Sequence, residues 1–280
     1  MRVALVQEIT KILDRFTVPN RNAIVSHTKH HTILSPLDGP AAEVINHRGT
    51  APICLVCEHA SAFMPDKLDG LGVAPEHRSS HAAWDIGALS LATKLAYRLN
   101  APLVASRVSR MVYDCNRPPE AAGAIPESSE IVKIPGNIGL TEEDRAARVT
   151  QVYEPFRNLL QDTLDNFTEP AALVTIHSFT PIWFGKQRDV ELGFLHDSDD
   201  RLARRMLAAC PAGLDARLNA PYSVADGVTH TLREHAIPRG LQNVMIEVRN
   251  DLVSDAVGVA RFAELLGRII SDALSIKGAP

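Results

Sequence analysis

Three side chains of this sequence, His59, His177 and Glu247, each follow or end a short apolar run that is rich in strand-forming residues. Imidazole nitrogens and carboxylate oxygens that meet in one place can bind a divalent metal ion or transfer protons. Zinc hydrolases use about three such ligands and keep one coordination position open for water. We therefore predict that His59 and His177 are metal ligands, and that Glu247 is a general base toward a water molecule.

Two carboxylates are candidates for the third ligand. Asp85 is expected in the first turns of a helix and could reach back toward the ends of the strands. Glu58 is adjacent to His59, but side chains alternate along a strand, so it would point to the opposite side. We predict His59, Asp85 and His177 as the metal ligands, with Glu58 as the alternative third ligand.

A polar segment that ends in two prolines contains Arg110, Asn116 and Arg117. A guanidinium group binds a carboxylate in bidentate fashion and can also stabilise the oxyanion of amide hydrolysis. We predict a catalytic role for Arg110 and substrate binding by Asn116, Arg117 and Ser178. The alternative is that Asp114 and Arg117 pair only to hold the segment in place. Because there is no G-x-S-x-G elbow, a serine nucleophile is not expected.

Strands and helices are expected to alternate along most of the chain. In an open sheet of this kind, ligands bind beyond the carboxyl ends of the strands. We predict an α/β fold, namely a three-layer α/β/α sandwich with a mixed central sheet, phosphorylase/hydrolase-like. The expected strands cover 52–57, 103–105, 172–176, 190–195 and 243–248, the expected helices about 79–99, 141–166, 199–209 and 257–276, and a long loop 121–139.

The N-terminal part of the sequence differs in character from the rest. Apolar residues within the first 13 positions have helical spacing, and the stretch 24–40 is rich in His, Thr, Ser and Pro. We predict a helix and arm over 1–46 and a single catalytic α/β domain over 47–280. His27, His30 and His31 lie in the arm, away from any expected scaffold, and are assigned no function.

Composition excludes several classes of protein. The chain is 45% hydrophobic and 22% charged, with a formal net charge of −4 and no basic tract, so nucleic acid is not an expected partner. No apolar run approaches the roughly 20 residues that span a bilayer, and the N-terminus is a poor signal peptide. Cys54 and Cys57 form a CxxC within an expected strand, which indicates buried thiols in a reducing cytoplasm.

Five motifs lie between residues 58 and 252: EHAS at 58–61, HAAWDIGA at 81–88, SRMVYDCNRPP at 109–119, IHSFTP at 176–181 and IEVRNDL at 246–252. Together they resemble the N-formylglutamate amidohydrolase family. The string SR-x-V-x-D-x-NR-P is the most specific of them. The resemblance implies a fold similar to that of zinc carboxypeptidases and aminoacylases, with one metal ion at the strand ends.

The family resemblance also implies roles for individual residues. His59 and His177 correspond to the metal histidines, Glu247 to the general base, and Arg110 with its neighbour Arg117 to substrate binders. Carboxypeptidases take a ligand from H-x-x-E, but here alanine occupies the third position after the first histidine. This departure is why we assign the third ligand to Asp85.

The expected function is that of a metal-dependent cytoplasmic amidohydrolase in amino-acid metabolism. Water activated by zinc, or by another divalent transition metal, would cleave an N-formyl or N-acyl amino acid, with N-formyl-L-glutamate giving glutamate and formate as the type reaction. The expected partner is this small molecule, without nucleic acid or membrane, and a homodimer is compatible with the sequence. The alternatives are a carboxypeptidase-like peptidase and a non-catalytic protein that binds an anionic metabolite.

Overall fold

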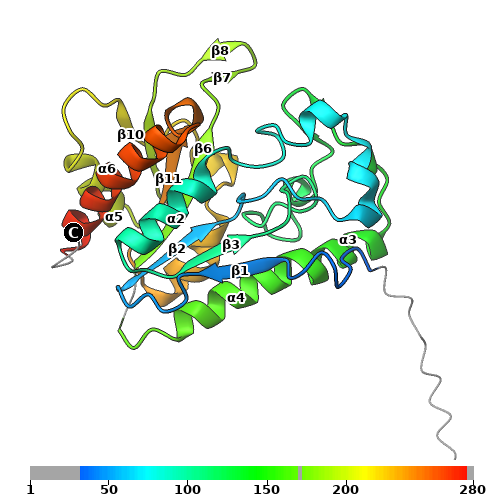
Figure 1. Ribbon diagram of the computed structural model, residues 1–280, viewed down its shortest axis with the longest axis horizontal. Coiled ribbons are helices and arrows are strands. Elements are labelled where there is room, and N and C mark those ends of the chain that lie inside the picture. Colours follow the sequence, from blue (N-terminus) through cyan, green and yellow to red (C-terminus); the bar gives the residue numbers. More distant parts are fainter. Residues whose placement is uncertain (1–31, 170–171, 276–280) are drawn as a thin grey trace, which may run out of the picture. The chain divides into compact units, whose positions relative to one another are not determined.

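The computed structural model describes residues 32–169 and 172–275 (Figure 1). The expected N-terminal helix and the three histidines of the arm lie outside these residues. The described chain is built around one seven-stranded sheet, in which the strands lie in the order β1-β3-β2-β6-β11-β9-β10. These strands are β1 (Ala42–Ile45), β2 (Ile53–Cys57), β3 (Leu103–Ser106), β6 (Ala172–Phe179), β9 (Leu192–Leu195), β10 (Ala216–Leu218) and β11 (Asn243–Arg249).

The prediction of a mixed sheet is confirmed. Strands β3, β2, β6 and β11 run parallel to one another. At the two sides of this group, β1 pairs antiparallel with β3 and β9 pairs antiparallel with β11, while β10 runs parallel to β9. The three strands expected to deliver polar groups, β2, β6 and β11, are consecutive in the sheet. Their carboxyl ends therefore meet at one edge. There His177 of β6 pairs in register with Glu247 of β11, which sends both side chains to the same face.

Helices pack against both faces of the sheet. Residues of β2, β3, β6, β9 and β11 form one apolar cluster with α2, α5 and α6, and the alternate residues of these strands form a second cluster with α4. Each large apolar side chain buried in this way contributes about 1.5–3 kcal/mol to folding. The helices are α2 (Ala88–Arg98), α3 (Glu142–Arg148), α4 (Glu154–Asp165), α5 (Arg201–Ala208) and α6 (Ala256–Leu274).

The helix expected over 79–99 is shorter than predicted, because α2 begins only at Ala88. Residue Gly87 precedes it with φ 83, a left-handed conformation that interrupts a helix and that glycine adopts without strain. The expected N-caps Ser79 and Ser80 lie in turns instead. Asp85 is consequently a loop residue and not a helical one, which corrects its predicted setting.

The helix expected over 141–166 is present but interrupted. Thr141 caps α3 by accepting a hydrogen bond from the backbone N–H of Asp144, as its sequence signature indicates. One π-helical turn, Val149–Tyr153, separates α3 from α4, and Pro155 is near the start of α4. Because a proline has no N–H to donate, it interrupts the hydrogen bonding of a helix. The π-helical turn therefore lies next to the proline at which an interruption is expected.

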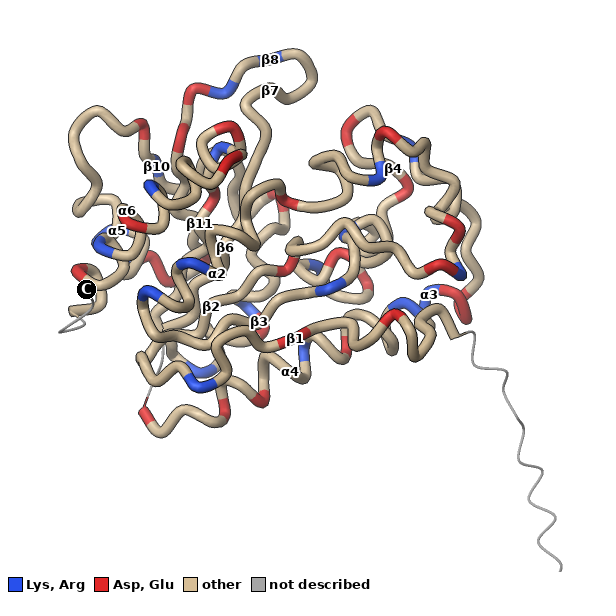
Figure 2. The backbone as a smooth tube through the Cα atoms, viewed as in Figure 1, with Lys and Arg blue, Asp and Glu red and all other residues tan. Residues whose placement is uncertain are grey.

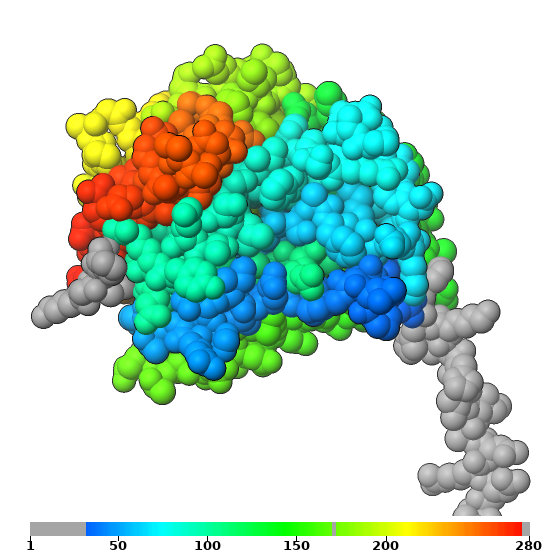
Figure 3. Space-filling model, viewed as in Figure 1, coloured from blue at the N-terminus to red at the C-terminus, as the bar shows by residue number. Residues whose placement is uncertain are grey.

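Several short strands also differ from the sequence analysis. β1 lies within the segment expected to be an arm, yet it pairs with β3 at the edge of the sheet. The long loop expected over 121–139 contains a hairpin of β4 (Ser128–Ser129) and β5 (Val132–Lys133). A second hairpin, of β7 (Ile182–Trp183) and β8 (Lys186–Gln187), follows β6. The tips of the two hairpins approach each other at the top of Figure 3.

Basic and acidic residues are interspersed along the described backbone (Figure 2). No helix among the described residues is long and apolar enough to cross a membrane. Cys54 and Cys57 are both fully buried in β2 but pack into opposite apolar clusters, as the spacing predicts. Burial raises the pKa of both thiols, so neither is poised to be a thiolate.

Candidate metal and active site

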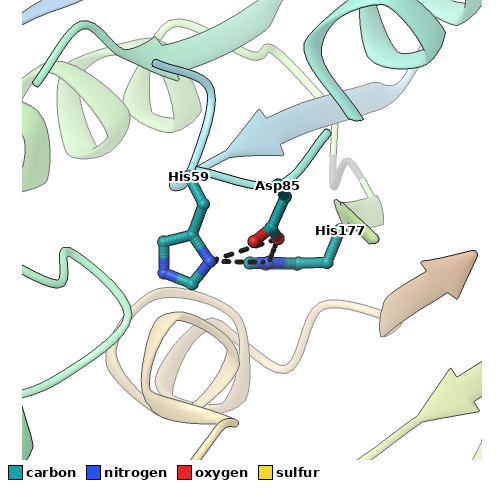
Figure 4. A group of neighbouring side chains, drawn as sticks. All are labelled: His59, Asp85 and His177. Atoms are coloured by element: carbon teal, nitrogen blue, oxygen red, sulfur yellow. Dashed lines mark hydrogen bonds and ion pairs between the residues drawn. The ribbon is translucent and has the colours of Figure 1, made fainter. Parts of the chain in front are cut away.

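Two histidines and one aspartate converge at the carboxyl edge of the sheet (Figure 4). The Nδ1 atoms of His59 and His177 are 3.2 Å apart. Oδ2 of Asp85 lies 3.2 Å from the first of these nitrogens and 2.9 Å from the second. All three residues are buried, with at most 4% of their surface exposed.

The triangle formed by these three atoms matches one face of a tetrahedral zinc site. Ligand atoms bound to zinc at about 2.0–2.1 Å in a tetrahedron are about 3.3 Å apart. The observed separations of 2.9–3.2 Å are close to this value. Among the described residues, His59, Asp85 and His177 form the cluster that could hold a metal ion, as the sequence analysis predicts.

Local backbone contacts bring Asp85 to the strand ends. Its N–H donates to the carbonyl of His59 at 3.0 Å, so the loop before α2 follows the loop after β2. On the other side, the N–H of Ser178 donates to Asp85 Oδ2 at 3.3 Å, and the Ser178 hydroxyl donates to the Ile86 carbonyl at 2.7 Å. The loop that carries Asp85 is thereby attached to both neighbouring strands.

The far nitrogen of each histidine faces a second, buried carboxylate. Nε2 of His59 lies 2.7 Å from Asp114 Oδ1. Nε2 of His177 lies 3.0 Å from Glu58 Oε2, an ion-pair contact without linear hydrogen-bond geometry. Such partners fix the tautomer that leaves Nδ1 free to bind a metal, and they increase its basicity. The structure therefore places Glu58 at the Nε2 side of His177, whereas the triangle of candidate ligand atoms includes Nδ1 of that residue.

Opposing effects act on the protonation of the two histidines. Burial lowers the pKa of His177, but Glu58 and Asp85 outweigh burial and raise it well above its usual value. Burial and Arg110 lower the pKa of His59, yet Asp114 and Asp85 raise it overall. In the absence of a cation the site attracts protons, and a metal ion would compete with them for the same Nδ1 atoms.

Glu247 lies beside this cluster on the neighbouring strand. The residue is 3% exposed, and its Oε2 has no hydrogen-bond partner in the described chain. Burial and the charge of Asp85 raise the pKa of Glu247 to about 7, while His177, His59 and Arg110 act in the opposite direction. A carboxylate with an unused oxygen and a pKa near neutrality is suited to accept and return a proton.

The predicted arginines surround the carboxylates of the site. Nη1 of Arg110 lies 3.4 Å from Asp85 Oδ1, and its Nη2 lies 3.0 Å from Asp114 Oδ2. Arg117 donates from Nη1 to the carbonyl of Asp226 at 2.6 Å, and its Nε lies 4.0 Å from Asp114 Oδ2. Arg110 therefore neutralises two buried acids, whereas Arg117 attaches its own segment to the loop that contains Asp226.

Asn116 and Ser178, both predicted to bind substrate, line the cavity but use their polar groups within the protein. The amide nitrogen of Asn116 donates to the carbonyl of Val228, and its oxygen accepts from the N–H of Thr231. The hydroxyl of Ser178 is engaged with the loop that carries Asp85. Their direct contact with a substrate stays a prediction; the contacts observed hold the walls of the site in place.

A cavity of about 490 Å³ opens over the cluster. It contains all the predicted site residues, together with side chains that the sequence analysis did not select. The sequence analysis did not select Arg188, because its contacts are with residues that lie in other segments of the chain. The additional polar and aromatic lining residues include His81, Asp114, Trp183, Arg188, Tyr222 and Asp226.

One contact joins the two hairpins across the mouth of the cavity. Oε1 of Glu130 accepts a hydrogen bond from the N–H of Phe184 at 2.9 Å. Oε2 of the same residue lies 3.0 Å from Nε2 of His81, a cavity residue. Glu130 and Phe184 each adopt a positive φ, of 50° and 47°, at the tip of its hairpin. We call this arrangement of Glu130, Phe184 and His81 the rim contact.

Comparison with known structures shows proteins of the same fold. A protein from Agrobacterium tumefaciens of known crystal structure is 47% identical, with a TM-score of 0.84, and the match covers 87% of this chain and 98% of that protein. The N-formylglutamate amidohydrolase of Ralstonia eutropha JMP134 has a TM-score of 0.62 at 16% identity, over 85% of this chain and 98% of that one, and therefore shows a shared fold.

Sequence comparison identifies the family. An N-formylglutamate deformylase from Pseudomonas putida is 28% identical over 204 residues, which cover 66% of this chain and 71% of that protein. Residues 51–254 match the model of the family described as N-formylglutamate amidohydrolase, and this range includes every predicted site residue. Since the match extends over well more than half of this chain, the chain belongs to the N-formylglutamate amidohydrolase family.

Proposed function

We propose that this protein is a metal-dependent amidohydrolase that removes the formyl or another small acyl group from an N-acyl amino acid. The observation that carries the proposal is the triangle of two Nδ1 atoms and one carboxylate oxygen, 2.9–3.2 Å apart. Both far nitrogens of the histidines face buried carboxylates, an arrangement typical of metal-ligating histidines.

His59, Asp85 and His177 would hold the metal ion, for which nitrogen and oxygen ligands in this geometry favour zinc. When bound, zinc would supply Lewis acidity and would lower the pKa of water toward neutrality. Asp114 and Glu58 would orient the two imidazole rings and keep a proton on each Nε2 atom.

Glu247 would act as the general base and then as the general acid. Its unpaired Oε2 accepts a proton from the attacking water as the new C–O bond forms at the amide carbon. The same oxygen returns that proton to the amide nitrogen as the C–N bond breaks. The products are then a free amino acid and formate or another short carboxylate.

The two arginines near the cluster would have different tasks. Arg110 contacts the carboxylates of both Asp85 and Asp114 and is positioned to stabilise negative charge on the amide oxygen in the transition state. Arg117 would bind the carboxylate next to the scissile bond. A cavity of about 490 Å³ is within the range of small-molecule sites, which supports a small acyl amino acid as the substrate.

The proposal is tested by metal analysis and by a substrate panel on the purified protein. We expect about one zinc ion per chain after incubation with zinc, and release of formate from N-formyl-L-glutamate and related N-formyl amino acids. Faster cleavage of dipeptides than of N-formyl amino acids would favour a peptidase instead. Absence of both metal and turnover, with saturable binding of an anionic ligand, would identify a binding protein.

A further inference from the structure

A second cavity, of about 370 Å³, lies beside α3, the helix labelled in Figure 1. No described residue lines both this cavity and the one at the sheet edge. Its walls come from segments far apart in the sequence, namely the chain before β1, the loop after β2, and α3 with the turn that precedes it. The polar residues that line it are Thr32, Lys67, Asp144 and Arg148.

The buried cation of this cavity is Arg148, which is 2% exposed. Its Nη1 donates a hydrogen bond to the carbonyl of Val112 at 2.8 Å, and within the described part of the chain no carboxylate lies at ion-pair distance from it. The acid on the same wall, Asp144, accepts hydrogen bonds through Oδ2 from the N–H and the hydroxyl of Thr141. A guanidinium group has five N–H donors, so Arg148 retains donors for a further partner.

The charge of Arg148 is not balanced by its surroundings. Burial lowers the pKa of this guanidinium to about 10, and Asp144 opposes the effect without cancelling it. Lys67 adds a second cation to the cavity wall, where its Nζ donates to the carbonyl of Thr32 at 3.0 Å. A buried charge without a close counter-ion costs free energy, and an anion bound in the cavity would offset that cost.

The simplest alternative is that Arg148 only holds the carbonyl of Val112 in place. Val112 belongs to the segment that carries Arg110 and Asp114, so this contact attaches α3 to a segment of the active site. One hydrogen bond to a carbonyl, however, needs a single neutral donor and no open space. That role leaves the remaining donors of the guanidinium, the cavity and the second cation without explanation.

We propose that Arg148 and Lys67 form a second binding site, which takes the phosphate or carboxylate group of a small metabolite. The fork of guanidinium donors suits either group in bidentate fashion, and the lysine adds a point charge. A cavity of about 370 Å³ is within the range of small-molecule sites and leaves room for more than the anionic group itself. The site is independent of the proposed function, because no residue assigned to catalysis lines it.

The test measures anion binding to the whole chain by calorimetry and by thermal unfolding. Inorganic phosphate and acetate are the probes of the two anionic groups, and chloride is the control for ionic strength. We expect saturable binding and a rise in Tm with at least one probe, but not with chloride at equal ionic strength. Tighter binding of phosphate would assign a phosphorylated ligand and tighter binding of acetate a carboxylate, and either outcome supports the site.

Substitutions then locate the bound anion. Arg148→Met should weaken binding by at least about 10-fold, because it removes a charge-assisted contact. Lys67→Met should weaken it by about 2- to 5-fold, because that ammonium group is exposed. Arg145→Met removes an exposed cation of the same helix and should leave the affinity unchanged. If Arg148→Met does not fold, Arg148→Lys replaces it and should also weaken binding, because an ammonium lacks the bidentate fork.

The cavity at the sheet edge also contains cations and could bind the same probes. Arg188→Gln and His177→Ala, which remove a cation and a proposed metal ligand there, should leave binding at the second site intact. Loss of binding in either of these variants, with full binding in Arg148→Met, would place the anion at the sheet edge and overturn the proposal. Absence of saturable binding by both probes, or equal affinity in the wild type and in the Arg148 and Lys67 variants, would also overturn it.

Discussion

His177 and Glu247 stand in register on adjacent parallel strands and are almost completely buried, with 1% and 3% of their surfaces exposed. At the mouth of the same cavity, Phe184 stands at the tip of a hairpin and is 61% exposed. A displacement of His177 or Glu247 would disrupt the pairing of two strands and the apolar core beneath them. The rim contact, in comparison, is made by the side chain of one glutamate. We infer that residues at the sheet edge tolerate less change than residues at the rim, because loops accept substitutions more readily than buried strands do.

The largest expected effect comes from removing a ligand at the sheet edge. His177→Ala should abolish metal binding and reduce turnover to background, because two ligands do not make a stable zinc site. Metal content by elemental analysis and formate release are the two measurements. His47→Ala, an exposed histidine elsewhere in the chain, is the matched control and should keep both. Full metal content in the His177 variant would refute its place in the site.

The next effect in size concerns proton transfer. Glu247→Gln should retain the metal but lower kcat by about 10²–10⁴-fold, since the amide cannot accept a proton from water. Because Glu247 must be deprotonated to act as a base, kcat/KM of the wild type should rise with pH. The apparent pKa of this rise should lie at or below 7, because burial and Asp85 raise the pKa of Glu247 to about 7 and a bound cation would lower it again. An unchanged acidic limb in the glutamine variant would assign the base to another group.

A smaller effect is expected from the carboxylates behind the histidines. Asp114→Asn and Glu58→Gln should each weaken zinc binding or activity by about 10- to 100-fold, because neutral side chains orient and polarise the imidazole less effectively. Competition with a chelator measures the affinity. If both variants bind zinc as tightly as the wild type, these carboxylates do not support the metal site.

The smallest effect is expected at the rim. Glu130→Gln should raise KM by about 2- to 10-fold with little change in kcat, because it weakens one contact at the mouth and leaves the metal ligands in place. Glu127→Gln, an exposed acid in the same segment, is the control and should have no effect on steady-state kinetics. A loss of kcat comparable to that of the Glu247 variant would mean that the rim contact affects the chemical step as strongly as the sheet edge does.

Local patterns in the sequence were sufficient to predict which residues meet at the carboxyl edge of the sheet. Buried runs that end in His or Glu predicted β2, β6 and β11, and parallel strands of one sheet must end at one edge, so the meeting of His59, His177 and Glu247 followed. The signal is strong because burial of a whole strand forces a continuous apolar run.

Other features depend on contacts between distant segments and carry no local signal. The sequence did not predict that Asp85 would be held by a loop before α2, which depends on the backbone of Gly87 and on hydrogen bonds to the His59 and Ser178 segments. Nor did it distinguish the roles of Glu58 and Asp114, because only the folded chain shows which nitrogen of each histidine a carboxylate faces.

The sequence by itself therefore determined the central strands of the sheet and the helices that cover them, but not the outer strands β1 and β10. It also determined the edge of the sheet where His and carboxylate side chains meet. Tertiary structure decided which carboxylate joins the two histidines, which arginines are paired with acids, and that Arg188, which has no acidic partner among the described residues, lies against aromatic rings. The physical reason is that periodicity reports burial and alternation along one element, whereas coordination and charge pairing depend on distances between elements.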